Sequence, residues 1–235
     1  RRGDDVASLY KALGISEVVI KAQVLSGKRG KNNGIRFCST EAEVVSAVSD
    51  LFSISIRDQY VFAVLIEEKL QIAEEHYLSI SYNTKTKQPM MVYSKKGGMD
   101  IEEVQESEIF TKDFDVRLQK IDNDDIPFIQ QLWDCFISED ARVAEINPLV
   151  KTASGRFVAA DAKIALDDDA FYRHESWKDF EPRSMMGRLP TEREIDAKKI
   201  DEGEAYYRGT AGKYIELDGD IAMILNGGGA SIANM

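Results

Sequence analysis

The sequence contains very little cysteine and histidine. Its 235 residues include two cysteines, Cys38 and Cys135, and two histidines, His76 and His174. Two cysteines cannot form the disulfide framework of a small secreted domain, and they suit a reducing compartment. We therefore expect a cytoplasmic protein, or a protein of the mitochondrial matrix in a eukaryote. The scarcity of histidine excludes a metal site built from several imidazoles.

Long apolar runs and positive charge are also scarce. No apolar run approaches the roughly 20 residues that cross a bilayer, and the first residues show no signal-peptide pattern. The net charge of -11 and the pI of about 4.8 disfavour nucleic acid as a partner, because most of the surface would repel phosphates. The composition therefore predicts neither a membrane protein nor a nucleic-acid-binding protein.

Apolar periodicity predicts a mixed succession of helices and strands. An amphipathic helix over residues 6–13 ends at a glycine, and Pro127 opens another helix. Capping boxes, Thr40 with Glu43 and Thr191 with Glu194, start two more helices, the first over about 41 to 52. Strands are predicted over 17–24, 35–38, 60–68, 75–83 and 88–95, followed by a hairpin over 144–164. The order has no regular β-α-β repeat, so it predicts an α+β fold.

The hairpin sequence AEINPLVKTASGRFVAADAKI places polar residues inside two apolar runs. If its turn is centred on Ser154, Asn147 faces Asp161 and Glu145 faces Lys163. Opposed residues have Cβ atoms about 5 Å apart, so an amide oxygen and a carboxylate can share one hard cation. A solvated strand face with one cross-strand ion pair is the alternative. The other face is predicted to be apolar and to carry Ile146, Val150, Val158, Ala160, Ala162 and Ile164.

A basic, glycine-containing loop follows a strand that carries one lysine. Lys21 lies in the apolar run VVIKAQV, directly before SGKRGKNNG. A lysine on a strand face can direct its ammonium group at a phosphate, and the backbone N–H groups of glycines approach an anion closely. An exposed basic hairpin turn is the alternative. The spacing matches neither a Walker loop nor a dinucleotide fingerprint.

Three further stretches carry weaker signals. LIEEKLQIAEE ends an apolar strand in carboxylates, which suits a strand beside an adenine and a ribose but is also common at strand ends. NGGGAS is typical of an anion nest or of a tight turn. SKKGGMDIEEV predicts a glycine turn into an acidic helix start, with a mostly structural role.

Taken in order, these stretches resemble one family. VIKAQVLSGKRGKNNGI, KKGGMDIEEV, EINPLV followed by DAK, and YIELDGDIAMILNGGGAS are similar to the nucleotide-binding β subunit of succinyl-CoA synthetase and to its relatives citryl-CoA synthetase and ATP-citrate lyase. The resemblance implies a two-lobed ATP-grasp domain over 1–180 without its N-terminal strand. It further implies a linker over 181–212 and, over 213–235, the start of a truncated flavodoxin-like α/β CoA-ligase domain.

The resemblance also implies a reaction. The family forms an acyl-CoA thioester from a carboxylate, CoA and ATP or GTP, through an acyl phosphate and a phosphohistidine. The phosphohistidine and the CoA site lie on a partner α subunit. By position, Lys21 would hold the nucleotide phosphates, and no further catalytic residue is expected on this chain. The other implied positions are the nucleotide contacts Lys28, Arg29, Gly30, Glu67, Leu70 and Glu75, the Mg²⁺ ligands Asn147 and Asp161, and the substrate-binding residue Asn226.

Two of these positions depart from the family pattern, and the substrate is left open. Lys28 replaces a usual small residue, and Leu70 stands where many members carry a hydroxyl. The NGGGAS loop resembles that of the citrate-using relatives, whereas DAKIALDDDAFYR resembles the succinate type. Succinate is expected first and citrate second. A non-catalytic ATP-grasp binding module and a dinucleotide-binding oxidoreductase are the alternatives from other classes.

Overall fold

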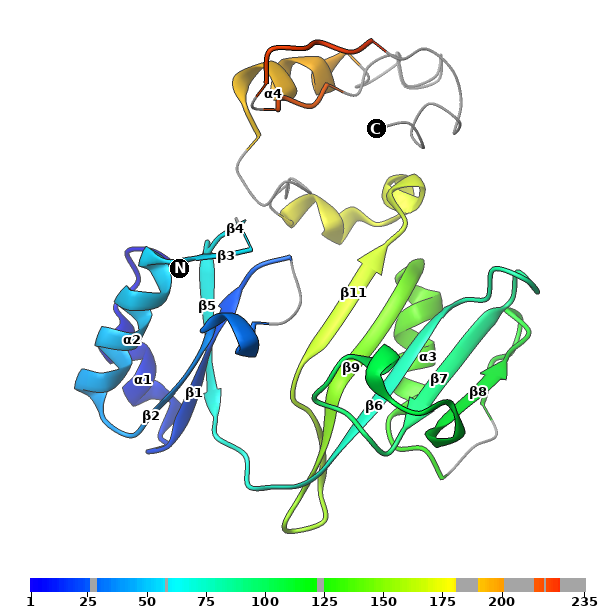
Figure 1. Cartoon of the computed structure of the whole chain (residues 1–235), viewed down its shortest axis with the longest axis horizontal. Helices are drawn as coiled ribbons and strands as arrows, with labels where there is room; N and C mark the ends of the chain where they lie inside the picture. The colour runs from blue at the N-terminus through cyan, green and yellow to red at the C-terminus, as the bar shows by residue number, and fades with distance from the viewer. Residues whose placement is uncertain are drawn as a thin grey trace.

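The computed structural model describes residues 1–25, 29–57, 59–121, 125–180, 190–200, 214–217 and 219–224. Two lobes stand side by side, each built on an antiparallel sheet (Figure 1). The chain passes from the first lobe to the second through the connection between β5 and β6. The described residues after 166 form a more peripheral C-terminal part (Figure 1). Within the described ranges no helix has the length and apolarity of a membrane span.

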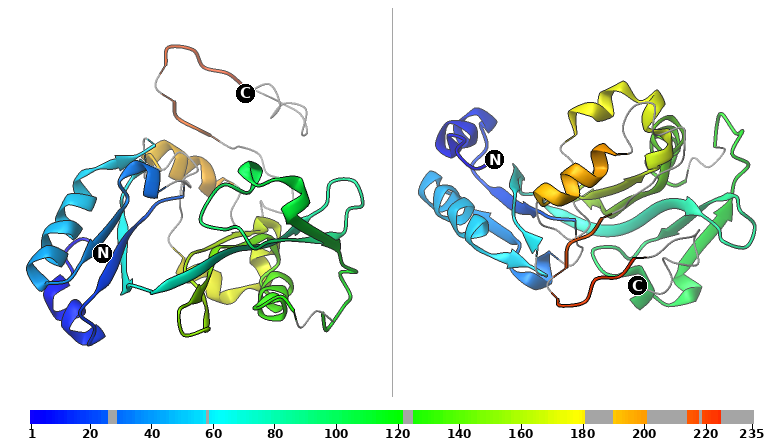
Figure 2. Two further views of the ribbon diagram at one scale, coloured as in Figure 1. Left: turned by 60° about the horizontal axis from the view of Figure 1, so that its bottom comes forward. Right: turned by 90° about the horizontal axis from the view of Figure 1, so that it is seen from above.

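The first lobe is a three-stranded sheet with the order β2-β1-β5. Its elements are α1 (Val6–Leu13), β1 (Val18–Gln23), η1 (Gly30–Asn32), β2 (Ile35–Cys38), α2 (Glu41–Ser53), β3 (Ser55–Ile56), β4 (Gln59–Tyr60) and β5 (Ala63–Glu68). The two α-helices cover one face of the sheet (Figure 2). Their apolar sides bury Val18, Ile20 and Ala22 of β1, which leaves the opposite face of β1, with Lys21, turned toward the second lobe.

The ends of the first-lobe helices confirm the capping predictions. Gly14 ends α1 in a left-handed conformation with φ of 65°, which costs glycine nothing. The Thr40 side chain accepts a hydrogen bond from the Glu43 backbone, and the Glu43 carboxylate accepts from the Thr40 N–H. This capping box starts α2 at the residue that the sequence predicts.

The second lobe is a sheet with the order β10-β9-β6-β7-β8, to which β11 is added beside β9. Its elements are β6 (Ile72–Tyr82), β7 (Pro89–Ser94), η2 (Ile101–Glu103), η3 (Glu106–Glu108), β8 (Ile109–Asp113), α3 (Ile129–Ser138), β9 (Ala141–Thr152), β10 (Phe157–Ala159) and β11 (Ala162–Leu166). α3 packs on one face of this sheet, and Trp133 and Phe136 fill the core. β11 is an edge strand, and it lies on the side that faces the first lobe (Figure 1).

Three predictions about elements need correction. GGMDIEEV forms the single 3₁₀ turn η2 and no α-helix. The helix expected at Pro127 begins at Ile129, because Phe128 takes a left-handed φ of 65°. The strand predicted over 60–68 is divided into β4 and β5, and β3 and β8 were not predicted, because β3 has only two residues and β8 is largely exposed, so neither gives an apolar periodicity.

After β11 the chain folds back onto the second lobe through two 3₁₀ segments, η4 (Asp168–Arg173) and η5 (Glu175–Asp179). Asp140, between α3 and β9, anchors them. Its carboxylate accepts hydrogen bonds from Arg173 Nε at 2.7 Å and lies 2.6 Å from His174 Nε2. The His174 ring stacks on Trp177 with centroids 3.9 Å apart, and Trp177 is buried. A Thr191–Glu194 capping box then starts α4 (Glu192–Lys199), as predicted.

This anchor predicts an acid-dependent stability. Hydrogen bonds from Arg173, and secondly from His174, lower the pKa of Asp140 to about 2 from its ordinary 3.8. Because the folded-state pKa is depressed, the carboxylate stabilises the fold above about pH 4, and this contribution disappears as the pH falls toward about 2. We expect Asp140→Asn to lower the thermal midpoint near neutral pH and to converge with the wild type in acid.

Thermal unfolding followed by circular dichroism over a pH series measures this difference. Asp115→Asn is the control, because a hydrogen bond from Arg117 also lowers the pKa of Asp115 to about 2. Asp115 and Arg117 are separated by only two positions in the sequence. A pair so local can also form in the unfolded chain, so its loss should change stability less. Identical midpoints for wild type and Asp140→Asn near neutral pH would contradict the anchoring role.

Candidate functional site

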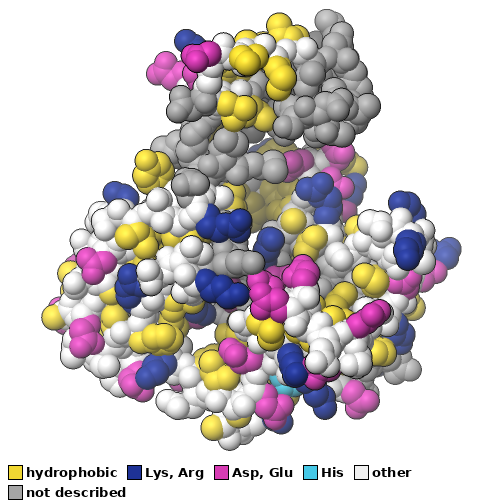
Figure 3. Space-filling view, viewed as in Figure 1, with side chains coloured by type: hydrophobic (Ala, Val, Ile, Leu, Met, Phe, Trp, Pro, Cys, Tyr) yellow, Lys and Arg dark blue, Asp and Glu magenta, His cyan; other side chains and the backbone are white. Residues whose placement is uncertain are grey.

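Charged groups of the two lobes meet where the lobes face each other. In the space-filling view, Lys and Arg side chains of the first lobe gather opposite Asp and Glu side chains of the second (Figure 3). We call this region the interlobe site. Its first-lobe members are Lys21, Arg29, Lys31 and Glu67, and its second-lobe members are Glu75, Gly98, Met99, Asp100, Glu103, Asn147, Ala160 and Asp161.

Lys21 joins the two lobes. In the sheet Lys21 pairs with Leu65, so Glu67, two residues further along β5, lies diagonally on the same face. The Lys21 ammonium forms an ion pair with Glu67 and donates to the Ala160 carbonyl at 2.6 Å. The Lys21 side chain is only 11% exposed. Its charge is therefore fixed at the boundary between the lobes, next to Asp161.

Arg29 crosses the boundary in the same direction. One guanidinium nitrogen donates to the Ala22 carbonyl of β1 at 3.1 Å, and another forms an ion pair with Asp161. The Gly34 N–H closes the loop by donating to the Arg29 carbonyl at 2.8 Å. Because the backbone and the guanidinium of Arg29 are both tied to the first lobe, its charge is aimed at one carboxylate of the second.

Lys31 makes a looser connection to the 3₁₀ turn η2. Its ammonium lies 3.7 Å from the Asp100 carboxylate and 3.6 Å from that of Glu103. The Lys31 side chain is mostly exposed, so these ion pairs contribute little to stability. Together with Lys21 and Arg29 they give the interlobe site three first-lobe cations that face second-lobe oxygens.

The hairpin has the predicted register. Lys163 pairs with Glu145, and the Asn147 N–H donates to the Asp161 carbonyl at 3.0 Å. Asn147 on β9 therefore lies opposite Asp161, which stands in the short gap between β10 and β11. The predicted ion pair is absent between these described side chains, because Glu145 accepts from the Tyr77 hydroxyl at 2.8 Å and Lys163 is exposed.

The predicted apolar face is only partly buried. Ile146 and Val150 on β9 are buried, but Ala162 and Ile164 on β11 are exposed. The physical reason is the position of β11, which pairs only with β9 among the described strands and so forms an edge of the sheet.

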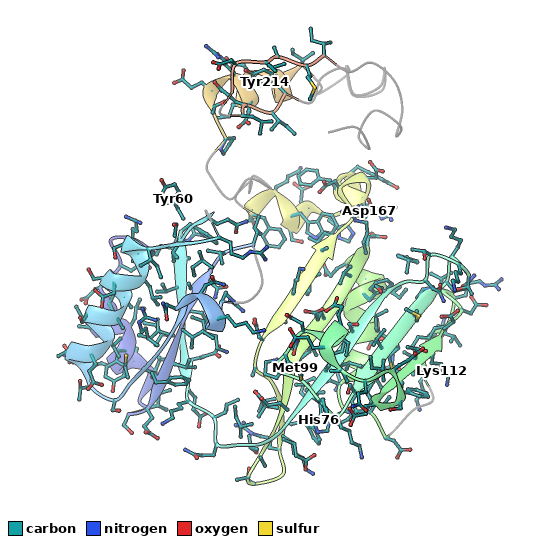
Figure 4. The ribbon with its side chains drawn as sticks, viewed as in Figure 1. Tyr60, His76, Met99, Lys112, Asp167 and Tyr214 are labelled. Carbon is teal, nitrogen blue, oxygen red and sulfur yellow. The ribbon has the colours of Figure 1, made fainter. Side chains whose placement is uncertain are left out.

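Asn147 is held by a turn between β7 and η2. Its Oδ1 accepts from the Gly98 N–H at 2.8 Å, and its Nδ2 donates to the Met99 carbonyl at 3.0 Å. Met99 lies on the side of the second lobe that faces the first (Figure 4). Because the oxygen and the nitrogen of the amide each have a matching backbone partner, the amide has a single orientation.

The remaining predicted contacts fall into three groups. Glu75 lies on β6, where its backbone carbonyl accepts from the Gly97 N–H at 2.8 Å. Gly30 opens η1 on the first lobe, and Leu70 is half-buried in the connection between the lobes. Lys28 and Asn226 lie outside the described residues. The roles assigned to all these residues stay predictions.

The donors at Asn147 and Asp161 fit a Mg²⁺ ion. Asn147 supplies an amide oxygen from β9, and Asp161 supplies a carboxylate from the gap between β10 and β11. The Asp161 carboxylate already pairs with a positive group, the Arg29 guanidinium. Within the described ranges no three His, Cys, Asp or Glu residues gather as a metal cage. A magnesium ion suits such a sparse site, because it takes most of its ligands from water and substrate phosphates.

Both histidines have structural partners. His76 is buried on β6, with its ring nitrogens 2.8 Å from the Tyr93 hydroxyl and 3.0 Å from Glu74 (Figure 4). His174 is held by Asp140 and Trp177. Burial raises the pKa of the two cysteine thiols, Cys38 and Cys135, which disfavours a nucleophilic role for either.

Several residues in or beside the interlobe site were not predicted from the sequence, among them Tyr77, Gly98 and Met99. Tyr77 supports Glu145, and burial raises the pKa of Tyr77, so its hydroxyl stays a donor. Gly98 and Met99 hold Asn147, whereas the sequence SKKGGMDIEEV predicts a mostly structural turn. The Gly97-Gly98 pair was the only hint of this turn in the sequence. It did not indicate the contact with Asn147, because Asn147 lies 49 residues further along the chain.

Comparisons with known proteins support this architecture. Residues 1–116 match the ATP-grasp domain family. The chain is 37% identical to the succinate–CoA ligase [ADP-forming] subunit beta of Methanocaldococcus jannaschii, over 93% of this chain and 60% of that protein. It is 33% identical to the same subunit of Bacteroides fragilis, over 99% of this chain and 62% of that protein.

A solved structure agrees in fold. The structure of ATP citrate lyase from Methanothrix soehngenii in complex with citrate and coenzyme A matches with a TM-score of 0.66 and 22% identity. The match covers 85% of this chain and 51% of that chain. The predicted ATP-grasp fold and the resemblance to succinate–CoA ligase β subunits are thus confirmed. The chain spans about 60% of the length of the curated relatives it matches.

Proposed function

We propose that this chain, which has an ATP-grasp fold and resembles succinate–CoA ligase β subunits, is the nucleotide-binding part of an acid–CoA ligase β subunit. The proposed reaction joins succinate and CoA at the expense of ATP. It passes through an acyl phosphate and a phosphohistidine on a partner α subunit, which also carries the CoA site. GTP is the alternative nucleotide.

One observation carries the proposal: fixed cations and oxygen donors converge on the interlobe site from two lobes. Enzymes that transfer phosphoryl groups act mainly by positioning the phosphates and neutralising their charge. Lys21 is suited to hold a phosphate because its ammonium is anchored and poorly exposed. Arg29 is suited to bind the same phosphates as Lys21, once phosphate oxygens replace the Asp161 carboxylate as the partner of its guanidinium.

The Mg²⁺ ion would be held by Asn147 and Asp161. When bound, such an ion neutralises phosphate charge and orients the phosphate oxygens. The chain's own part is to keep the two ligands in place. The backbone hydrogen bond between Asn147 and Asp161 sets their separation, and the Gly98 and Met99 backbone groups orient the amide.

The phosphohistidine is proposed to belong to the partner because of where this chain's histidines lie. His76 is 3% exposed, and both of its ring nitrogens have partners. His174 is stacked against Trp177 and bound to Asp140. Neither ring is free to accept a phosphoryl group without loss of these contacts. The complete β subunit alone is therefore expected to bind nucleotide with little or no turnover.

Citrate is the second candidate substrate, favoured by the form of the NGGGAS loop. An assay of thioester formation tests both, with the complete β subunit, its α partner and CoA. Succinate and citrate are compared in parallel, each with ATP and with GTP. We expect the highest rate with succinate and ATP. A higher rate with citrate would make citrate the substrate instead of succinate. Absence of thioester formation from both acids would reject the proposed ligase function.

A further inference from the structure

The turn over residues 97–99 contacts two predicted ligand-binding residues from different strands. Its Gly98 N–H and Met99 carbonyl hold the two ends of the Asn147 amide, on β9. On its other side, the Gly97 N–H donates to the Glu75 carbonyl of β6 at 2.8 Å. The turn therefore connects the predicted metal ligand Asn147 with the predicted nucleotide contact Glu75.

This turn packs so closely on β6 that its glycines admit no side chain without movement. A Cβ atom on Gly97 would lie 2.1 Å from the His76 carbonyl oxygen, which is backbone and cannot give way. A Cβ atom on Gly98 would lie 2.7 Å from Glu75 Oε2, and Gly98 has a φ of 71°. The Glu75 carboxylate thus lies directly against the peptide that orients Asn147.

We propose that Gly98 is a positioning residue for the Mg²⁺–nucleotide site. Its N–H orients the Asn147 oxygen, and its missing side chain leaves the space that the Glu75 carboxylate occupies. Gly98 thereby orients the metal ligand together with the Met99 carbonyl, and it leaves room for the predicted nucleotide contact Glu75. The inference rests on the proposed function, because it assumes that Asn147 and Glu75 serve a bound nucleotide.

Gly98→Ala is the variant that tests this role. The atoms in its way belong to the end of a flexible Glu75 side chain, so the protein can fold while Glu75 swings aside and the Gly98 peptide shifts. Gly97→Ala is unsuitable, because its clash is with backbone. The measurement is the affinity of the complete protein for ATP as a function of Mg²⁺ concentration, by isothermal titration calorimetry.

Gly155→Ala is the matched control. Gly155 also has a positive φ, of 82°, in the turn between β9 and β10, but a Cβ atom there meets nothing within 4 Å. Both variants carry the backbone strain of alanine at positive φ. We expect Gly98→Ala to raise the Mg²⁺ concentration for half-maximal enhancement of ATP binding by about 10-fold, and Gly155→Ala by less than about twofold.

The outcomes separate this inference from the proposed function. If the wild type shows no Mg²⁺-dependent ATP binding, the proposed function fails. If the wild type shows it and the two glycine variants have the same Mg²⁺ midpoint, the positioning role of Gly98 is overturned.

A second measurement applies should Gly98→Ala not fold. NMR with selective ¹⁵N labelling of asparagine in the wild type should then show the Asn147 side-chain amide as a resolved, slowly exchanging pair, identified by its loss in Asn147→Ser. A rapidly averaged Asn147 amide would equally overturn the proposal.

Discussion

Lys21→Ala is expected to weaken ATP binding by about 10- to 100-fold in the presence of Mg²⁺. A hydrogen bond to a charged group contributes about 1.5–3 kcal/mol, and about 1.4 kcal/mol corresponds to a tenfold change in affinity. The Lys21 side chain is 11% exposed and anchored by Glu67 and the Ala160 carbonyl, so little solvent screens its charge. Isothermal titration calorimetry of the complete protein with ATP measures the change.

Lys11→Ala is the matched control for this variant. Lys11 also pairs with a glutamate of the first lobe, Glu41 at 3.0 Å, but this pair lies on the helices, on the other side of the sheet. Its loss should leave the affinity for ATP within about twofold, because exposed ion pairs contribute at most about 1 kcal/mol, and to stability rather than binding. Equal affinities of the wild type and Lys21→Ala would show that Lys21 does not contact the nucleotide.

Asp161→Ala is expected to remove the dependence of ATP binding on Mg²⁺. The variant deletes the only carboxylate among the two predicted ligands, and it also frees Arg29 from its ion pair. In the presence of a chelator, the variant should therefore bind ATP at least as tightly as the wild type. The Arg29 guanidinium is then available to the phosphates, and the Asp161 carboxylate no longer repels them. With Mg²⁺ added, only the wild type should gain affinity, by about 10-fold or more.

A metal ligand and a merely structural aspartate differ in this comparison. Loss of a metal ligand weakens ATP binding only when Mg²⁺ is present. Asp115→Ala provides the comparison, because Asp115 is likewise paired with an arginine, Arg117 at 2.8 Å, but lies after β8, outside the interlobe site. Its Mg²⁺ dependence should match that of the wild type. A folded Asp161→Ala variant that keeps the full Mg²⁺ enhancement would refute the metal assignment.

Local signals made much of the fold predictable. The capping box of Thr40 and Glu43 places the start of α2, because two orphan backbone donors are satisfied within four residues. The turn around Ser154 fixes the hairpin register, and hence the opposition of Asn147 and Asp161, because antiparallel pairing runs outward from the turn. Both inferences need only residues that are close along the chain.

The contacts that complete the interlobe site were not predictable in this way. Arg29 and Asp161 are 132 residues apart in the sequence, and Lys21 and Ala160 are 139 apart. Their meeting depends on how two lobes are placed, which no local pattern encodes. The exposure of Ile164 was equally unpredictable, because alternation along β11 gives the face of each side chain but does not reveal that this strand lies at an edge.

The proposed function requires that a Mg²⁺–nucleotide binds at the interlobe site. Calorimetric titration of ATP into the wild-type protein, once with Mg²⁺ and once with a chelator, tests this most directly. We expect saturable binding at one site, with an affinity that falls by about 10-fold or more when Mg²⁺ is removed. Absence of ATP binding, or binding of equal strength with and without Mg²⁺, would contradict it.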